Sequence, residues 1–205
     1  MLTLYHSPHS RASRIIQLLD ELDALSRVEI RTVGVVRQDG SGAVDPTNPH
    51  PEGKVPLLVH DGVEIWESNA ILLYLTDLFP AKGLGVAAGD PLRGRYLSWL
   101  AWYGNVVEPV IVGRFAEVTH PAFAATFRGM PELTQRLVTA LEAGPFLMGE
   151  TFSAADLLLT SPFMTIPDAA PDHPRVQAWI ARCAARPSVQ RTAAFDAAHL
   201  ATAAP

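Results

Sequence analysis

The sequence has little cysteine and little lysine. Cys183 is the single cysteine among 205 residues, and Lys54 and Lys82 are the only lysines. One thiol excludes an internal disulfide framework and is typical of a reducing compartment. There is no long basic run and the net charge is −5 at pH 7. The chain therefore lacks the footprint of a nucleic-acid-binding protein, and its acidic balance argues weakly against anionic membranes.

Long apolar runs are also missing. No uninterrupted stretch approaches the roughly 18 apolar residues of a transmembrane helix. The segment that follows Met1 lacks the charged and apolar regions of a signal peptide. We therefore expect a cytoplasmic protein. With 48% hydrophobic and 18% charged residues, the composition is that of a chain that buries an ordinary core, in one large domain or two small ones.

The residues up to 80 alternate between strand and helix patterns. Their apolar spacing and turn residues predict, in chain order, a strand (2–5), a helix (11–23), a strand (26–35), an irregular loop (37–53), two strands (55–60 and 63–66) and a helix (68–79). Asp61-Gly62 is a strong two-residue hairpin signal between the last two strands, and Ser68 stands where an N-cap is expected. We predict an α/β domain over residues 1–80, with a mixed four-stranded sheet.

The strand patterns disappear after a Gly-rich segment, residues 81–89, which we expect to be a linker. Helical spacing of apolar residues recurs from there on, so we predict an all-α domain over residues 90–205. Its first long helix contains Gly104 and Pro109, which indicate that this helix is bent or broken.

One helix start is marked clearly within this helical domain. Ser153 and Asp156 form the S-x-x-D pattern of a capping box for a helix that begins at Ala154, and Phe152 and Leu157 are placed as a hydrophobic staple. The carboxylate also lies at the positive end of the helix dipole. We interpret this pattern as structural.

Three segments together resemble the cytosolic glutathione transferase superfamily. They are "SPHSRASR" (7–14), "NPHPEGKVPLLVHDGVEIWESNAILLYL" (48–75) and "FLMGETFSAADLLL" (146–159). The resemblance covers essentially the whole chain. It implies a thioredoxin-like N-terminal domain, a helical C-terminal domain and a homodimer. The implied ligands are glutathione as co-substrate and a small hydrophobic electrophile, with no metal.

The resemblance also implies how the peptide part of glutathione is held. In this superfamily the bond that corresponds to Val55–Pro56 is cis, which turns the Val55 backbone outward to pair with glutathione like one rung of an antiparallel ladder. Ser68 is implied to receive the γ-glutamyl carboxylate at the start of a helix, where free N–H groups favour an anion. Glu67 is implied to meet the γ-glutamyl amine. The alternative is that Ser68 only caps its helix.

The loop ahead of the hairpin offers two more candidates for glutathione binding. Lys54 stands beside Val55 and can pair with the glycyl carboxylate, although it can equally be a solvated loop lysine. His50 lies in the same loop and is the weaker candidate.

Ser10 is the candidate donor to the glutathione thiolate. It lies two residues after Pro8 and four before Arg14, an arrangement similar to that of serine-type members of the superfamily. A hydroxyl directed at sulfur near a helix start stabilises the thiolate, and each unit of pKa depression corresponds to about 1.4 kcal/mol. The alternative is that Ser10 is only the N-cap of the first helix.

Other hydroxyls lie close to Ser10 in the sequence. Tyr5 stands at the end of the first strand, as in tyrosine-type members, although its spacing to Pro8 is one residue longer. Ser7 and Ser13 are further alternatives. His9 departs from the serine-type pattern and can line the mouth of the pocket. No cysteine lies near these residues, which argues against members that form a mixed disulfide with glutathione.

A wall for the second substrate is expected on the first long helix of the helical domain. Four apolar side chains recur there at intervals of four residues: Tyr103, Val107, Ile111 and Phe115. They can line an apolar pocket that faces the glutathione sulfur. Core packing is the alternative for each of them.

The leading hypothesis is therefore a glutathione transferase, in which the glutathione sulfur attacks a small electrophile. A glutathione-dependent peroxidase, reductase or isomerase on the same fold is the second hypothesis. A non-catalytic binding or regulatory protein is the third, because fold does not determine function. The intact "KVP" and "ES" elements argue against the third.

Overall fold

The computed structural model describes residues 1–203, which divide into two units. The first unit contains residues 1–82 together with the last helix, and the second contains residues 83–186. The elements of the first unit are β1 (Leu2–His6), α1 (Ser13–Glu21), β2 (Glu29–Thr32), β3 (Leu57–His60), β4 (Val63–Trp66), α2 (Ser68–Leu78) and α9 (Pro187–Ala203). Short 3₁₀ turns lie at Leu25–Arg27 and Pro80–Lys82.

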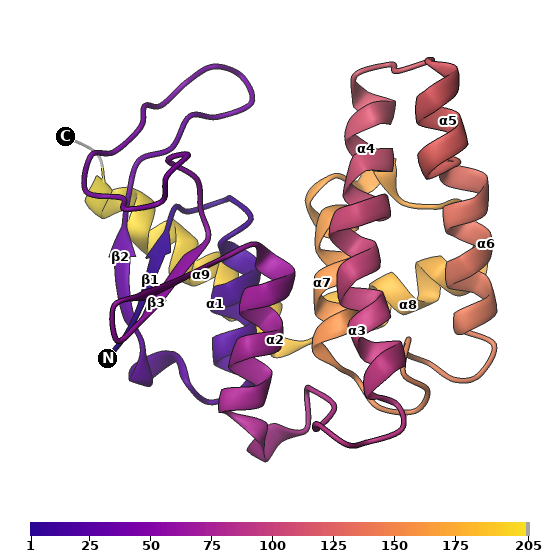
Figure 1. Cartoon of the computed structure of the whole chain (residues 1–205), viewed down its shortest axis with the longest axis horizontal. Coiled ribbons are helices and arrows are strands. Elements are labelled where there is room, and N and C mark those ends of the chain that lie inside the picture. The colour runs from indigo at the N-terminus through magenta and orange to yellow at the C-terminus, as the bar shows by residue number, and fades with distance from the viewer. Residues whose placement is uncertain (204–205) are drawn as a thin grey trace. The chain divides into compact units, whose positions relative to one another are not determined.

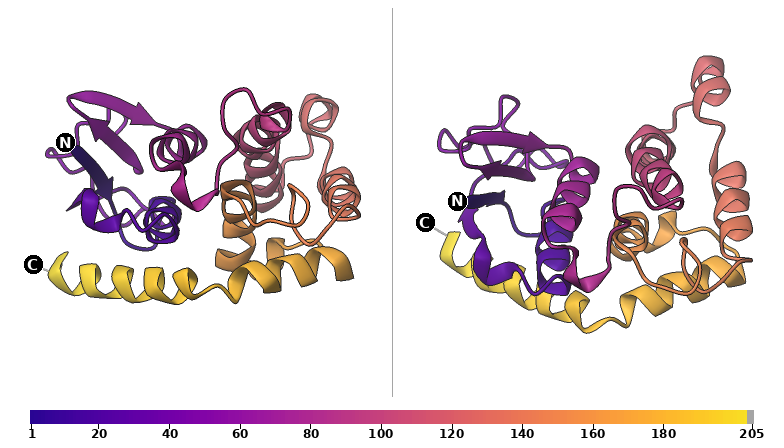
Figure 2. Two further views of the ribbon diagram at one scale, coloured as in Figure 1. Left: turned by 90° about the horizontal axis from the view of Figure 1, so that it is seen from below. Right: turned by 60° about the horizontal axis from the view of Figure 1, so that its bottom comes forward.

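The strands form one mixed sheet in the order β2-β1-β3-β4. β1 pairs with β2 in parallel and with β3 antiparallel, and β3 pairs antiparallel with β4. The parallel pair is connected through α1, and α1 lies beside both α2 and α9 (Figures 1 and 2). The predicted thioredoxin-like topology of the first part of the chain is thus confirmed.

The hairpin between β3 and β4 turns at the predicted dipeptide. Asp61 has φ 49° and Gly62 has φ 84°, so both central residues adopt the left-handed backbone that a tight two-residue hairpin requires. The preceding strand β2 is shorter than predicted, because its first residues form a 3₁₀ turn.

The start of α2 differs by one residue from the prediction. Ser68 is the first residue of the helix, and Glu67 is its N-cap, with φ 69° and ψ 125°. The Glu67 carbonyl accepts the first helical hydrogen bond, from the Ile71 amide (3.0 Å). The left-handed backbone of Glu67 therefore ends the hairpin and opens the helix, a role that sequence reasoning gave to Ser68.

The second unit is helical among the described residues. Its helices are α3 (Arg93–Trp102), α4 (Glu108–Phe115), α5 (Pro121–Phe127), α6 (Met130–Ala140), α7 (Ala154–Thr165) and α8 (Pro174–Ala184), with a 3₁₀ turn at Pro167–Ala169. A π-helical turn, Tyr103–Val107, separates α3 from α4, so the predicted break near Gly104 and Pro109 is present. The capping box of Ser153 and Asp156 also forms, and α7 begins at Ala154 as predicted.

The last helix does not belong with the predicted helical domain. The expected domain ran over 90–205, of which the last two residues lie outside the described part. The structure instead places α9 against α1 in the first unit. Ser188 donates a hydrogen bond to Glu21 (2.6 Å), and Arg191 binds Asp20 through two nitrogens. The spacing of apolar residues predicts that a helix forms but not which helix it packs against. The packing of α9 on α1 depends on contacts between residues far apart in the sequence.

No helix within the described residues is long and apolar enough to cross a membrane.

Candidate functional site

The turn between β1 and α1 carries Ser10. The Ser10 hydroxyl donates to the Ser7 carbonyl (2.6 Å) and accepts from the Ala12 amide (3.1 Å). The side chain is half-buried. These two bonds hold it in the turn just ahead of α1. The N-cap of α1 is Ala12, without a side-chain capping bond, so the alternative that Ser10 is the N-cap of this helix is wrong. For Ser10 to donate to a thiolate, its proton must leave the Ser7 carbonyl, while the bond from Ala12 can persist.

The other candidate hydroxyls also have protein partners: Tyr5 accepts from Arg31 (3.3 Å), Ser7 accepts from Arg37 (3.1 Å) and Ser13 donates to Asp196 (2.5 Å). Tyr5 is buried and packs with Val33 and Leu57. Ser13 is bound by a carboxylate, which is a strong acceptor. Of the four hydroxyls, only that of Ser10 has a backbone carbonyl as its acceptor.

A buried carboxylate from the last helix contacts this turn, and sequence reasoning missed it. Asp196 accepts from the His9 amide (2.9 Å) and the Ser13 hydroxyl, and its Oδ1 lies 3.0 Å from His6 Nε2. Burial alone raises the pKa of Asp196, but the contact with His6 and the bonds from Ser13 and the His9 amide outweigh it and hold the pKa below its usual value. Asp196 is the only acid in the stretch "TAAFDAAHL", which was the available signal.

Arg37 contacts the same turn from the long loop after β2. Its guanidinium donates to Ser7 Oγ (3.1 Å), to the Pro8 carbonyl (3.0 Å) and to the His9 carbonyl (3.2 Å). His9 has a left-handed backbone with φ 53°, and its imidazole is largely exposed. The sequence offered no spacing signal for Arg37, since the loop has no regular structure.

The Val55–Pro56 peptide bond is cis, as the resemblance implied. Pro56 is buried and Val55 is half-buried. The preceding segment is held by Asn48, which is also buried: its Nδ2 donates to the Lys54 carbonyl (3.0 Å) and its Oδ1 accepts from the His50 amide (3.1 Å). Asn48 was missed as a site residue, although asparagine in "TNPH" is a typical turn former.

The two candidate side chains in the loop before Val55 have partners in the same loop. Lys54 is exposed and forms an ion pair with Glu52, and this contact lowers the pKa of the Glu52 carboxyl. His50 Nδ1 accepts from the Glu52 amide (3.0 Å). A glycyl carboxylate would therefore compete with Glu52 for Lys54, in a solvent-exposed pair that is worth little by itself.

Glu67 and Ser68 stand at the N-terminus of α2, as the sequence pattern required. Ser68 is buried and Glu67 is exposed. The first N–H groups of a helix have no intrahelical acceptor, and the helix dipole favours an anion there. This end of α2 suits a carboxylate.

The predicted substrate wall is mostly buried within the second unit. Tyr103, Val107 and Ile111 are each less than 5% exposed, whereas Phe115 is 59% exposed. The π-helical turn that begins at Tyr103 adds a residue to the turn, so a spacing of four no longer marks one helix face there.

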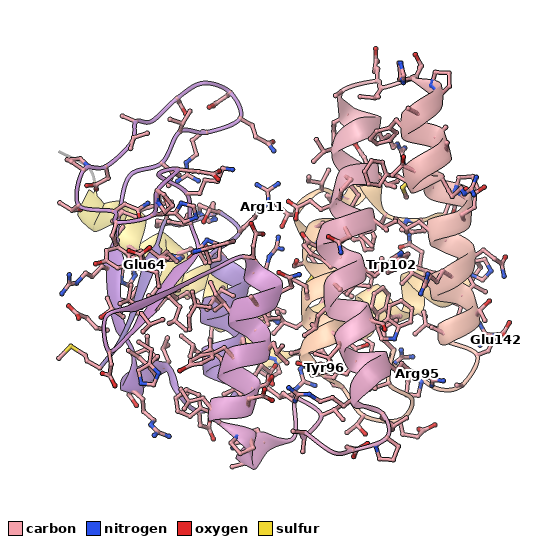
Figure 3. All side chains as sticks on the ribbon, in the orientation of Figure 1. Arg11, Glu64, Arg95, Tyr96, Trp102 and Glu142 are labelled. Atoms are coloured by element: carbon pink, nitrogen blue, oxygen red, sulfur yellow. The ribbon has the colours of Figure 1, made fainter. Side chains whose placement is uncertain are left out.

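The neighbouring Trp102 lies on the side of α3 that faces α6 (Figure 3), where Arg136 stacks over its ring at 5.0 Å. The burial of Tyr103, Val107 and Ile111 favours core packing for these three members of the wall.

Comparison with known proteins identifies the family. Residues 1–77 match the family model for the glutathione S-transferase N-terminal domain, and residues 107–187 match the model for the C-terminal domain. The chain belongs to the cytosolic glutathione transferase superfamily. Ser10, Val55 and Ser68 all lie within the matched N-terminal region.

Relatives at 28–29% identity can be aligned over most of this chain. A glutathione S-transferase-like protein, OpS6 of Beauveria bassiana, is 28% identical over 73% of this chain and 76% of its own length. The crystal structure of a glutathione transferase from Methylococcus capsulatus has 29% identity and a TM-score of 0.76, over 96% of this chain and 99% of that one. A sphingomonad glutathione S-transferase, solved in complex with glutathione, has 29% identity and a TM-score of 0.73, over 95% and 98%.

The candidate site residues fall into separate units of this chain. The candidates for glutathione binding belong to the first unit, whereas the four wall residues belong to the second. Among the described residues, no group of three or more His, Cys, Asp or Glu side chains is placed to hold a metal ion.

Proposed function

We propose that this protein is a glutathione transferase that joins the sulfur of glutathione to small hydrophobic electrophiles. The observation that carries the proposal is the match of residues 1–77 to the N-terminal domain of the family, with Ser68 at the start of α2 and Ser10 beside the start of α1. The relative solved with bound glutathione supports the choice of ligand.

The proposed chemistry uses the glutathione sulfur as nucleophile. Glutathione loses its thiol proton to solvent water, and its sulfur forms a bond to an electrophilic carbon. Either a leaving group then departs with the bonding electrons, or an activated double bond takes them up and is protonated by water. A free thiol has a pKa of about 8.5 and is only a few per cent ionised at neutral pH. Hydrogen-bond donation from Ser10 lowers this pKa, and binding holds the two reactants close together.

We assign the peptide part of glutathione to the candidate groups near Ser10 in the first unit. The γ-glutamyl carboxylate lies at the N-terminus of α2, with Ser68, and the amine lies near Glu67. The backbone of Val55, next to Pro56, pairs with the peptide. Lys54 binds the glycyl carboxylate once it leaves Glu52. His50 has a smaller share, because its ring already accepts the Glu52 amide.

Replacing Ser10 tests the assignment of the thiolate donor. In Ser10→Ala, we expect turnover of a chloronitroarene to fall about 10- to 100-fold, since a hydrogen bond to a charged group is worth about 1.5–3 kcal/mol. The control is Ser98→Ala, which removes an exposed hydroxyl that bonds to the Gly94 carbonyl (2.8 Å) in α3. Rates unchanged by Ser10→Ala would move the role to Tyr5 or to a backbone N–H.

The same assays separate the three hypotheses of function. Wild-type protein is measured for binding to immobilised glutathione, for turnover of a chloronitroarene and for turnover of an organic hydroperoxide. Conjugation supports the proposal, whereas hydroperoxide turnover alone would favour a peroxidase. Tight binding without turnover of either substrate would favour a non-catalytic protein. A homodimer and a cytoplasmic location complete the proposal.

A further inference from the structure

The turn that carries Ser10 is held by charged side chains from two distant parts of the chain. Residues 7–10, here called the Ser10 turn, lie between β1 and α1. Asp196 reaches the turn from α9, and Arg37 reaches it from the loop after β2. All of these residues belong to the first unit.

Asp196 binds the amide side of this turn. Its Oδ2 accepts both the His9 amide (2.9 Å) and the Ser13 hydroxyl (2.5 Å), and its Oδ1 faces His6. The carboxylate side chain is only 3% exposed. A buried charge is tolerated only where it is paired and hydrogen-bonded, so the position of this carboxylate is closely determined by its donors.

Arg37 binds the carbonyl side of the turn. Its guanidinium donates to the Pro8 and His9 carbonyls and to Ser7 Oγ, at 3.0–3.2 Å. The Asp196 carboxylate therefore accepts from the N–H of His9, and the Arg37 guanidinium donates to its C=O. Hydrogen bonds to ionised partners are shorter and stronger than neutral ones.

The backbone of the turn needs such support. His9 has φ 53°, a left-handed conformation that costs a non-glycine residue roughly 1–2 kcal/mol. A residue is held there only when its surroundings determine its conformation. Ser10 follows directly, so a change at His9 would displace the Ser10 hydroxyl.

We propose that Asp196 is a positioning residue for Ser10: through the His9 amide, and opposed by Arg37, it fixes the Ser10 turn in the geometry in which Ser10 donates to the glutathione thiolate. The first part of this inference, that Asp196 holds the turn, stands on the contacts alone. The consequence for the thiolate rests on the proposed function.

The same helix supplies a matched control. Ser188 is fully buried, donates to Glu21 (2.6 Å) and accepts from Gln17 (3.2 Å). Ser188→Ala therefore weakens the contact of α9 with α1 without touching the Ser10 turn. A purely structural role of Asp196 in attaching α9 would give both variants the same effects at a matched loss of stability.

The experiment compares wild type, Asp196→Ala, Asp196→Asn and Ser188→Ala. Hydrogen exchange of a peptide that covers residues 7–12 reports on the turn without any ligand. The absorbance of the thiolate against pH gives the pKa of bound glutathione, and steady-state kinetics give kcat and KM.

We expect Asp196→Ala to speed exchange in this peptide at least about 10-fold, to raise the bound thiol pKa by about 0.5–1 unit, and to lower kcat about 3- to 10-fold with little change in KM. Ser188→Ala should leave the exchange rate, the pKa of the bound thiol and kcat near their wild-type values. Asp196→Asn should lie between wild type and Asp196→Ala, because its amide oxygen can still accept from His9 and Ser13 while its NH₂ group faces His6.

Arg37→Ala is a second variant that keeps the proposal testable if Asp196→Ala does not fold. It lies in a loop outside the sheet and helices, and should loosen the same peptide. Exchange that is unchanged in the Asp196 variants, or raised equally by Ser188→Ala, would overturn the positioning role. A wild type that binds glutathione without lowering its thiol pKa would overturn the proposed function instead, and the exchange data would still decide whether Asp196 holds the turn.

Discussion

At the scale of single residues, Asp156 shows which of a side chain's hydrogen-bond partners a local sequence pattern can predict. Its carboxylate accepts the Ser153 amide and hydroxyl (both 2.9 Å), the Leu147 amide (2.8 Å) and the Trp179 indole N–H (2.9 Å). The Ser153 partner could be predicted, because a capping box has a fixed spacing. Leu147 and Trp179 could not, since they come from a loop and another helix. Burial raises the pKa of Asp156, and these four donors act against that rise.

Replacing Asp156 by alanine should destabilise the second unit by about 2–4 kcal/mol. The change removes a helix cap worth about 1 kcal/mol and leaves buried donors unpaired, each of which costs about 1–3 kcal/mol. Chemical denaturation measures the loss. Ser161→Ala, which removes a hydroxyl bonded only to the Leu158 carbonyl of the same helix, should change the free energy of unfolding by less than about 0.5 kcal/mol. Equal losses in both variants would contradict this account.

Cys183 should be inert in the folded protein. Burial, with a smaller contribution from the charge of Asp156, raises the pKa of its thiol to about 12, so the thiolate is nearly absent at pH 8. We expect a disulfide reagent to label Cys183 only after unfolding.

The same thiol should make the stability depend on pH. Because an unfolded thiol ionises near pH 8.5 and the folded one does not, the free energy of unfolding should fall as the pH rises above 8.5. Cys183→Ala should reduce that slope. Rapid labelling of the native protein would contradict the assignment.

At the scale of elements, the sequence predicted which segments form helices better than where each helix packs. The period of apolar residues gave α1, α6 and α7, because that period comes from the helix itself. It could not show that α9 returns to α1, as no local rule links residues so far apart. It also missed α5, a short helix capped by the His120 ring, and the π-helical turn that disrupts the spacing of the predicted substrate wall.

The start of α2 provides a test of glutathione binding at this scale. Ser68→Ala should weaken glutathione binding about 10- to 100-fold, because a carboxylate at the helix start would lose one charge-assisted hydrogen bond. Titration calorimetry measures the affinity, and thermal unfolding checks that α2 is intact. Thr134→Ala is the comparison, since it removes a hydroxyl that bonds only to the Met130 carbonyl of its own helix. Unchanged affinity in Ser68→Ala would show that Ser68 serves only the helix.

At the scale of the whole molecule, two of the three strand pairings were predictable because they follow from short connections. The third, between β1 and β3, does not, since a long loop separates β2 from β3. A β-α-β unit gives a parallel pair and a two-residue hairpin gives an antiparallel one. The candidate site was predictable only where the family pattern marked it, at Ser10, Val55 and Ser68. Its supports, Asp196, Arg37 and Asn48, could not be predicted because they act through contacts between distant segments.

The expected homodimer can be tested at the exposed edge strand β4. Val63 and Trp66 are 65% and 55% exposed, and a hollow lined by Ile65, Leu73 and Tyr74 lies between this strand and α2. If this apolar face is the dimer contact, Val63→Lys should convert a species of twice 22.2 kDa to the monomer in analytical ultracentrifugation. Val44→Lys, at a valine of similar exposure (59%) in a loop, should leave the mass unchanged. A wild type that sediments at the monomer mass would refute the homodimer.

The return of α9 to the first unit affects the order in which a newly made chain can mature. The His9 amide and its acceptor on Asp196 are separated by 187 positions. At a synthesis rate of about 5–20 residues per second, the acceptor leaves the ribosome roughly 10–40 s after the donor. A nascent polypeptide can thus form its sheet early, whereas the bond between the His9 amide and Asp196 has to wait until residue 196 has been synthesised and has left the ribosome.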